Sequence, residues 1–163
     1  MDVSTDAKKD SLDVSESLTF TLPIAMNMAE GFDNGTIPPY GWILSNTIST
    51  YTDSGKFGNA SPSLRMRSSG QKIITPIFNG PATSLSFWIK GIATDPASSL
   101  LVEGFDGINW ITIENINSLP LTGIVKTYNA SSIPLLGDNF IQFRFTFNQS
   151  AGNLAFDDVA VNY

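Results

Sequence analysis

The feature that most constrains this chain is a strict alternation of apolar and polar residues in several short segments. Residues 85–90 read Leu-Ser-Phe-Trp-Ile-Lys, and residues 141–147 read Ile-Gln-Phe-Arg-Phe-Thr-Phe. Shorter runs of the same kind cover residues 18–22 and 64–67, and near the C-terminus Leu154 and Phe156 are followed by an alternation at Val159 and Val161. A period of two places successive side chains on opposite faces of a β-strand. Each segment is therefore predicted to be a strand with one face on a hydrophobic core.

Turn-forming residues separate these runs and define the predicted fold. Gly, Asn, Asp and Pro interrupt them, as at Asn34-Gly35, Asp53-Ser54-Gly55 and Asn79-Gly80-Pro81. These residues tolerate or preset the backbone angles of tight turns. Roughly nine to eleven short strands, with no capped segment of helical period, predict an all-β, two-sheet antiparallel β-sandwich of the jelly-roll type. We expect residues 1–17 to be a flexible tail or linker and residues 18–163 to form one domain.

Composition excludes several classes of function. The chain has no cysteine and no histidine, which removes disulfides, thiolate or imidazole zinc sites and the Ser-His-Asp triad. Its net charge of -6 argues against nucleic-acid binding, which favours basic domains. There is no run of 18 apolar residues, so membrane insertion is not expected. A charged fraction of only 15%, many Ser, Thr and Asn residues and eleven Phe favour a secreted or cell-surface β-protein. Because a nucleophile–base pair is hard to build without His or Cys, we expect the protein to bind rather than catalyse.

Several short motifs occur in an order that resembles a known family. Residues 30–33 read Glu-Gly-Phe-Asp, residues 85–91 read Leu-Ser-Phe-Trp-Ile-Lys-Gly, and residues 153–159 read Asn-Leu-Ala-Phe-Asp-Asp-Val. This order resembles the MAM family and the MAM-like jelly-roll domains of secreted bacterial proteins, of the choice-of-anchor and cleaved-adhesin types. It is also similar to jelly-roll carbohydrate-binding modules. The paired cysteines usual in MAM domains are absent, which favours the bacterial branch.

The resemblance covers residues 30–163 and implies a function outside the cytoplasm. Its members bind glycans or mediate adhesion, so the expected partner is a glycan or a cell-surface protein. A protein–protein adhesion or structural domain is the first alternative. A jelly-roll lyase or glycosidase is the second, for which Glu103 and Glu114 are the only glutamates in predicted strands. Two such carboxylates could serve glycoside hydrolysis if they faced each other across a cleft, and otherwise they lie on a solvated face.

A calcium site is the first candidate site. The resemblance implies that the first and last segments pair, which would bring together Glu30, Asp33, Asp157 and Asp158. Carboxylate and carbonyl oxygens are the ligands that a structural Ca²⁺ ion prefers. Neighbours on a strand point to opposite faces, so only one of the last two aspartates can be a ligand, and Asp157 is preferred. In the alternative, both aspartates accept backbone hydrogen bonds that tie the termini together.

A sugar-binding face is the second candidate site. Side chains on the predicted outer side of three strands include an indole for stacking and several planar or cationic hydrogen-bond donors. Arginines on such a face would favour acidic glycans, because guanidinium matches carboxylate bidentately. In the alternative, Trp88 packs in a second small core under a loop. The candidate ligand-binding residues are Arg65, Arg67, Trp88, Lys90, Gln142 and Arg144.

Overall fold

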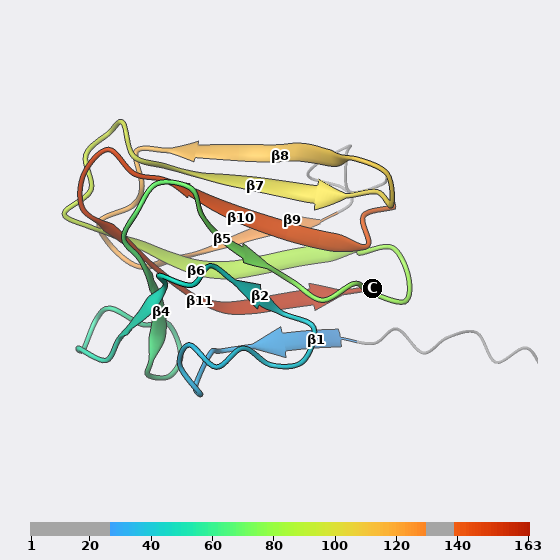
Figure 1. Cartoon of the computed structure of the whole chain (residues 1–163), viewed down its shortest axis with the longest axis horizontal. Helices are drawn as coiled ribbons and strands as arrows, with labels where there is room; N and C mark the ends of the chain where they lie inside the picture. Colours follow the sequence, from blue (N-terminus) through green and yellow to red (C-terminus); the bar gives the residue numbers. More distant parts are fainter. Residues whose placement is uncertain (1–26, 130–138) are drawn as a thin grey trace, which may run out of the picture.

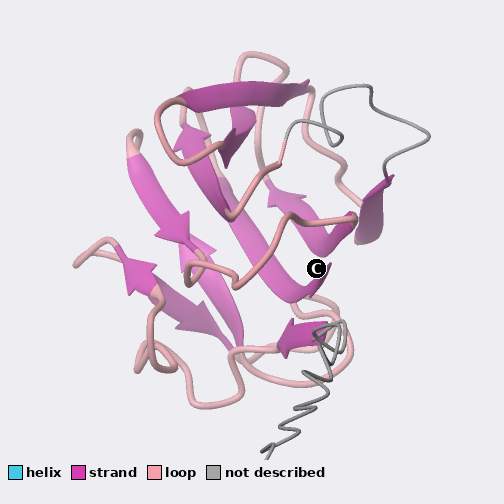
Figure 2. Cartoon of the chain, turned by 90° about the vertical axis from the view of Figure 1, so that its right-hand side faces the viewer, coloured by secondary structure: helices cyan, strands magenta, loops and turns pink. Residues whose placement is uncertain are grey.

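The computed structural model describes residues 27–129 and 139–163. All the regular secondary structure in these ranges is β-strand. Figures 1 and 2 show two stacked sheets joined by loops. This confirms the predicted all-β jelly-roll sandwich. Within these ranges, no helix is long and apolar enough to cross a membrane. The strand predicted at residues 18–22 and the boundary after residue 17 lie outside the described residues.

Both sheets are antiparallel, and the chain passes repeatedly from one to the other. The six-stranded sheet has the order β3-β4-β11-β6-β9, with β1 paired to β11. The five-stranded sheet has the order β2-β5-β10-β7-β8. The first sheet contains β1 (Asn27–Glu30), β3 (Ser49–Tyr51), β4 (Ser63–Met66), β6 (Ser84–Ile92), β9 (Ile124–Asn129) and β11 (Asn153–Asn162). The second contains β2 (Ile43–Leu44), β5 (Gln71–Ile74), β7 (Ser99–Phe105), β8 (Trp110–Asn117) and β10 (Gln142–Asn148).

The core lies between the sheets and is built from the alternating residues. Phe87 on β6, Phe145 on β10 and Phe156 on β11 are completely buried. The rings of Phe87 and Phe145 meet edge to face across the sandwich, with centroids 4.9 Å apart. Phe87 also stacks on Phe156 within its own sheet, at 5.5 Å. Each buried phenylalanine contributes about 1.5–3 kcal/mol, so these rings are a main source of the stability of the fold.

The first and last strands lie side by side, as the resemblance implied. In Figure 1, β1 runs antiparallel to β11 along its outer edge. Glu30 pairs with Val159, which places the acidic residues at both ends of the domain close together. Strand β11 is irregular here, because its register shifts between Asp157 and Ala160. Asp158 lies in this bulge with a positive φ of 47°.

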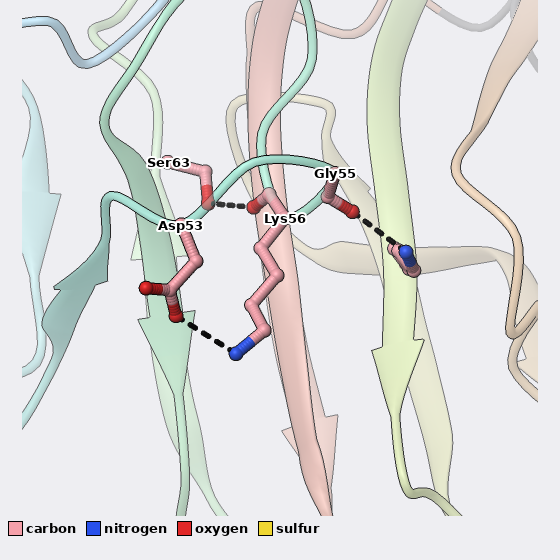
Figure 3. Close-up of polar contacts among 5 residues, drawn as sticks. Asp53, Gly55, Lys56 and Ser63 are labelled. Carbon is pink, nitrogen blue, oxygen red and sulfur yellow. Dashed lines mark hydrogen bonds and ion pairs between the residues drawn. The ribbon is translucent and has the colours of Figure 1, made fainter.

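The loop between β3 and β4, residues 52–62, folds over the outer face of the six-stranded sheet. The Gly55 carbonyl oxygen accepts a hydrogen bond from Lys90 Nζ at 2.6 Å. Lys56 pairs with Asp53 inside the loop, and Ser63 donates to the Lys56 carbonyl oxygen (Figure 3). The loop is thus attached to β6 and closed by its own polar contacts.

Candidate functional site

Trp88 lies on the outer side of its strand, as predicted, but it is only 9% exposed. Its indole forms a second small hydrophobic cluster with Tyr51 and Ala155. Two glycines approach it closely: a Cβ atom at Gly123 would lie 2.6 Å from Cε2 of the indole, and one at Gly58 would lie 3.2 Å from Cγ. The geometry matches the alternative in which Trp88 packs under a loop, and it leaves little ring surface for a sugar.

The six candidate ligand-binding residues do not form one surface. Arg65, Trp88 and Lys90 belong to strands of the six-stranded sheet, whereas Gln142 and Arg144 belong to the five-stranded sheet. All five point away from the core, so the two groups lie on opposite outer faces of the sandwich. This corrects the prediction of a single ligand face. The physical reason is that alternation separates inward from outward side chains but does not say which sheet a strand joins.

On the five-stranded sheet, Arg144 is the centre of a compact group. Its Nε and Nη2 atoms donate to both carboxylate oxygens of Glu103, at 2.7 and 2.6 Å. Its guanidinium lies 4.2 Å from the ring centre of Trp110. Trp110 in turn meets Phe105, with centroids 5.1 Å apart. We call Glu103, Phe105, Trp110 and Arg144 the Trp110 face.

The strand register explains this grouping. Arg144 pairs with Glu103 between β10 and β7, and Phe105 pairs with Trp110 between β7 and β8. Directly opposed residues lie about 4.5–5.5 Å apart and share a face of the sheet. The group is partly exposed, although Glu103 itself is only 8% exposed. Sequence reasoning did not place Trp110 and Glu103 in this site, and only the pairing of β7 with β8 and β10 could have indicated it.

The Trp110 face is bordered by apolar side chains toward the edge strand β2 and by the polar side chain of Gln142 on β10. Arg144 is opposed on its other side by Ile74, which is paired with Ile43 on the edge strand β2. Ile43 is 56% exposed, so the outer surface continues to that edge. The Gln142 amide is already engaged, because its Nε2 donates to the Thr75 carbonyl oxygen at 2.8 Å.

The two strand glutamates do not face each other across a cleft. Glu103 binds Arg144 on the outer face of the five-stranded sheet. Glu114 accepts hydrogen bonds from Tyr128 Oη at 2.6 Å and Lys126 Nζ at 3.1 Å, at the edge where β8 approaches β9. Burial, together with the Glu114 carboxylate, raises the pKa of Tyr128. The carboxylate pair considered for a glycosidase is therefore not formed by these residues.

An acidic pocket lies where β1 and β11 meet the 52–62 loop. It has a volume of about 290 Å³, and its lining includes Glu30, Asp33, Asn59 and Asp158. A Cβ atom at Gly31 would lie 3.5 Å from Asp33 Oδ1 and 3.6 Å from Asp158 Oδ1. Two carboxylates therefore border the same small space, which the absence of a side chain at Gly31 leaves open.

The bulge in β11 turns both terminal aspartates toward the 52–62 loop. Asp157 accepts a hydrogen bond from the Gly58 amide at 2.8 Å, and Asp158 accepts one from the Asn59 amide at 2.6 Å. The expectation that they point to opposite faces is wrong, because it assumed a regular strand. Asp158 lines the pocket, whereas Asp157 lies beneath the loop and is completely buried. Their backbone bonds fasten the loop, and not the termini.

Burial and like charge perturb the acids of this region. Burial raises the pKa of Asp157 to about 7, and the negative charges of Asp158 and Asp33 add to the effect. The pKa of Glu30 is also raised, mainly by burial and further by Asp33. Carboxyl groups that are buried beside other carboxylates bind protons more readily than exposed ones do. A bound cation would relieve the same repulsion between the negative charges.

The pocket suits a hard cation in its donor chemistry. Asp33 and Asp158 contribute carboxylate oxygens, the type of ligand that Ca²⁺ prefers. In the part of the chain that the structure describes, no three acidic side chains come close enough to form a metal-binding group. A cation held here would therefore need ligands beyond carboxylates, such as backbone carbonyl oxygens or water.

Comparisons with known proteins define the class of fold. No protein-family model and no curated protein matches the sequence. The structure is similar to the K1 cleaved adhesin domain of Lys-gingipain from Porphyromonas gingivalis W83, with a TM-score of 0.62 and 16% identity over 83% of this chain and 97% of that domain. It is also similar to TmCBM61 in complex with β-1,4-galactotriose (TM-score 0.57, 13% identity, 81% and 93% coverage). A xylan-binding domain from CBM 22 gives a TM-score of 0.51, with 15% identity and coverage of 83% and 92%.

These similarities confirm the resemblance noted in the sequence. The chain has the jelly-roll fold of cleaved adhesin domains and carbohydrate-binding modules. At identities below 20%, the similarity establishes a shared fold, and function has to be argued from the residues of the site.

Proposed function

We propose that this chain is a non-catalytic carbohydrate-binding module that acts at the cell surface or outside the cell, and that the Trp110 face is its binding surface. The observation that carries the proposal is the partly exposed indole of Trp110 beside the Arg144–Glu103 pair. Sugars bind proteins through an aromatic ring that covers an apolar sugar face and planar polar groups that bond to hydroxyls. The Trp110 face offers both on one rigid sheet.

The charge balance of this face favours a neutral sugar. Glu103 compensates the charge of Arg144 through two hydrogen bonds, so the pair offers donors and acceptors with no net charge. An acidic glycan would have to compete with Glu103 for the same guanidinium. The acidic ligand expected from the arginines is therefore not the one we propose for this face. β-1,4-Galactan and xylan are the first polysaccharides to test, because two similar structures are named for such ligands.

The direct test is binding of galactan and xylan by affinity electrophoresis and calorimetry. Trp110→Ala should weaken binding by about thirtyfold, since truncation of a hot-spot aromatic costs about 2 kcal/mol or more. Trp110→Phe should retain part of the affinity, because it keeps a ring. Ile37→Ala, at a side chain that is 75% exposed in a loop, is the matched control and should have no effect. Unchanged binding by a folded Trp110→Ala protein would refute the proposal.

Protein–protein adhesion is the second candidate, and the edge strand β9 favours it. Ile124 and Val125 on this strand are 39% and 62% exposed, and Leu121 just before it is 62% exposed. Apolar edge strands are surfaces on which another chain can pair. If the wild-type protein binds no polysaccharide, and Val125→Lys abolishes capture by a protein partner, adhesion through β9 replaces sugar binding.

A structural Ca²⁺ ion in the acidic pocket is part of the same proposal. Asp33 and Asp158 would hold it, with Glu30 and Asp157 close by, and it would fasten β1 to the 52–62 loop. A ligand at a hundredfold excess over its Kd stabilises the fold by about 2.7 kcal/mol. A chelator should therefore lower the melting temperature by about 5–11 °C, and Asp158→Asn should abolish that difference. Unchanged melting together with no metal in the purified protein would exclude the site.

A further inference from the structure

One row of outward side chains crosses the whole five-stranded sheet. In the strand register each residue of this row is directly opposed to the next, and every strand contributes one: Ile43, Ile74, Arg144, Glu103 and Thr112. Directly opposed residues share a face of the sheet. In Figure 1 the same strands follow one another from β8 at the top to β2 below. We call these residues the cross-strand row.

The cross-strand row continues the Trp110 face to the far edge of the sheet. Its ion pair belongs to both, and Thr112 lies on the same side of β8 as Trp110, two residues further along the strand. Thr112 is exposed, Ile74 is partly exposed, and Ile43 on the edge strand β2 is 56% exposed. The four strand spacings from β8 to β2 amount to about 19 Å, at about 4.8 Å each. The continuous surface is therefore much longer than one sugar.

The accessible side chains follow this row across the strands rather than along any one strand. On β10, the outward neighbours of Arg144 are Gln142 and Thr146. Thr146 is only 8% exposed, and the Gln142 amide already donates to a backbone carbonyl oxygen. Across the strands, by contrast, the ion pair is followed by the two isoleucines of the row. A ligand that leaves the indole thus finds accessible apolar surface toward β2, and not along β10.

We infer that the Trp110 face is one end of a longer site, which binds the interior of a linear, neutral glycan lying across the strands. This inference rests on the proposed function and adds the direction and length of the ligand. A sugar in an extended β-1,4-linked chain is about as long as one strand spacing, so the row accommodates about four to five sugars. The central ion pair serves hydroxyl groups, and Ile74 and Ile43 cover the apolar faces of the sugars furthest from Trp110.

The dependence of affinity on ligand length tests this inference. Calorimetry compares β-1,4-linked xylo-oligosaccharides and galacto-oligosaccharides, from the disaccharide to the hexasaccharide. For the sugar that the protein binds, affinity should rise by about tenfold or more up to the pentasaccharide, because each added sugar covers more apolar surface of the row. It should then level off. The polysaccharide should bind with the same affinity per site as the pentasaccharide, because its interior occupies the site.

Ile43→Ser tests the end of the site that lies furthest from Trp110. It should weaken binding of the pentasaccharide by about fivefold, since it removes part of the apolar contact, and leave binding of the disaccharide unchanged. Trp110→Ala should weaken binding of both ligands. Val125→Ser is the matched control, because Val125 is 62% exposed on β9, the edge strand of the other sheet. It should bind both ligands as the wild-type protein does.

Two results would overturn the length of the site: an affinity that does not rise beyond the disaccharide, or equal binding of the pentasaccharide by Ile43→Ser and Val125→Ser. Its direction is overturned if Lys72→Ala weakens binding more than Ile43→Ser, because the exposed Lys72 lies two residues along β5 from Ile74. In these cases a loss of binding in Trp110→Ala still supports the proposed function. A wild-type protein that binds no oligosaccharide or polysaccharide would refute the proposed function and this inference together.

Discussion

Replacing Gly123 with alanine tests whether Trp88 is a packed residue or part of an open surface. A Cβ atom at Gly123 would overlap the Trp88 indole at Cε2. The ring has little room to shift away, because Gly58 borders it at Cγ. The variant adds one methyl group and changes neither charge nor hydrogen bonding. Any loss of stability therefore reports how tightly the indole is held.

The expected magnitude follows from the two opposing effects of the substitution. Overpacking a closed site costs about 1–3 kcal/mol. Alanine in place of glycine also stabilises by about 0.4–1 kcal/mol, because it restricts the unfolded chain. Gly80→Ala provides the control, since its Cβ atom would meet no atom within 4 Å and its φ is not positive. Gly123→Ala should thus melt about 2–12 °C below Gly80→Ala, at about 2–4 °C per kcal/mol.

A double-mutant cycle completes this experiment. Trp88→Ala should by itself cost about 3–5 kcal/mol, the usual loss for a buried large aromatic residue. In the Trp88→Ala background, Gly123→Ala should lose its penalty, because the atoms that it overlaps are gone. Thermal and urea unfolding followed by circular dichroism measure all four proteins. Equal melting of Gly123→Ala and Gly80→Ala, or an unchanged stability of Trp88→Ala, would refute the packing and return Trp88 to the candidate ligand residues.

Three further substitutions test the polar contacts. Glu103→Gln should cost about 2–3 kcal/mol in urea unfolding, because it leaves Arg144 half-buried without its counter-charge. Tyr128→Phe should cost about 1–2 kcal/mol in the same assay, because it removes the hydrogen bond to Glu114 at the sheet edges. Asp157→Asn should flatten the dependence of melting temperature on pH between about pH 4 and 7, measured in the presence of a chelator.

The alternation in the sequence predicted the core because burial follows a local period. Phe87, Phe143 and Phe145 are buried where the period places them, and Trp88 and Arg144 point outward as expected. Long-range pairing has no such local signal. The sequence therefore could not show that Trp88 and Arg144 lie on opposite faces of the sandwich, since that depends on which sheet each strand joins.

Two other features depended on contacts between distant segments. Trp88 is covered by the 52–62 loop at Gly58 and by the segment before β9 at Gly123, because both glycines permit a close approach, and glycine in the sequence does not say what approaches it. The Arg144–Glu103 pair depends on the register of β10 against β7, which a single sequence does not specify. The acidic residues at the two ends of the domain were placed together only through the resemblance, and the pairing of β1 with β11 confirms that placement.

The pH dependence of Asp157 follows from the bulge in β11, which buries its carboxyl group completely. Burial, with the charges of Asp158 and Asp33, raises its pKa from 3.8 to about 7. A raised carboxyl pKa means that the folded protein binds the proton more tightly than the unfolded chain does. The resulting stabilisation is complete below about pH 4 and is lost as the pH rises through 7.

At 1.4 kcal/mol per pKa unit, that loss is at most about 4 kcal/mol. With chelator present, wild-type protein should melt at a lower temperature at pH 7.5 than at pH 4.5. The asparagine side chain introduced by Asp157→Asn resembles the protonated carboxyl group at every pH. The melting temperature of the wild-type protein minus that of the variant therefore isolates this one group from the other carboxylates. A difference in melting temperature that stays constant from pH 4 to 7.5 would show that Asp157 is not buried as the bulge places it.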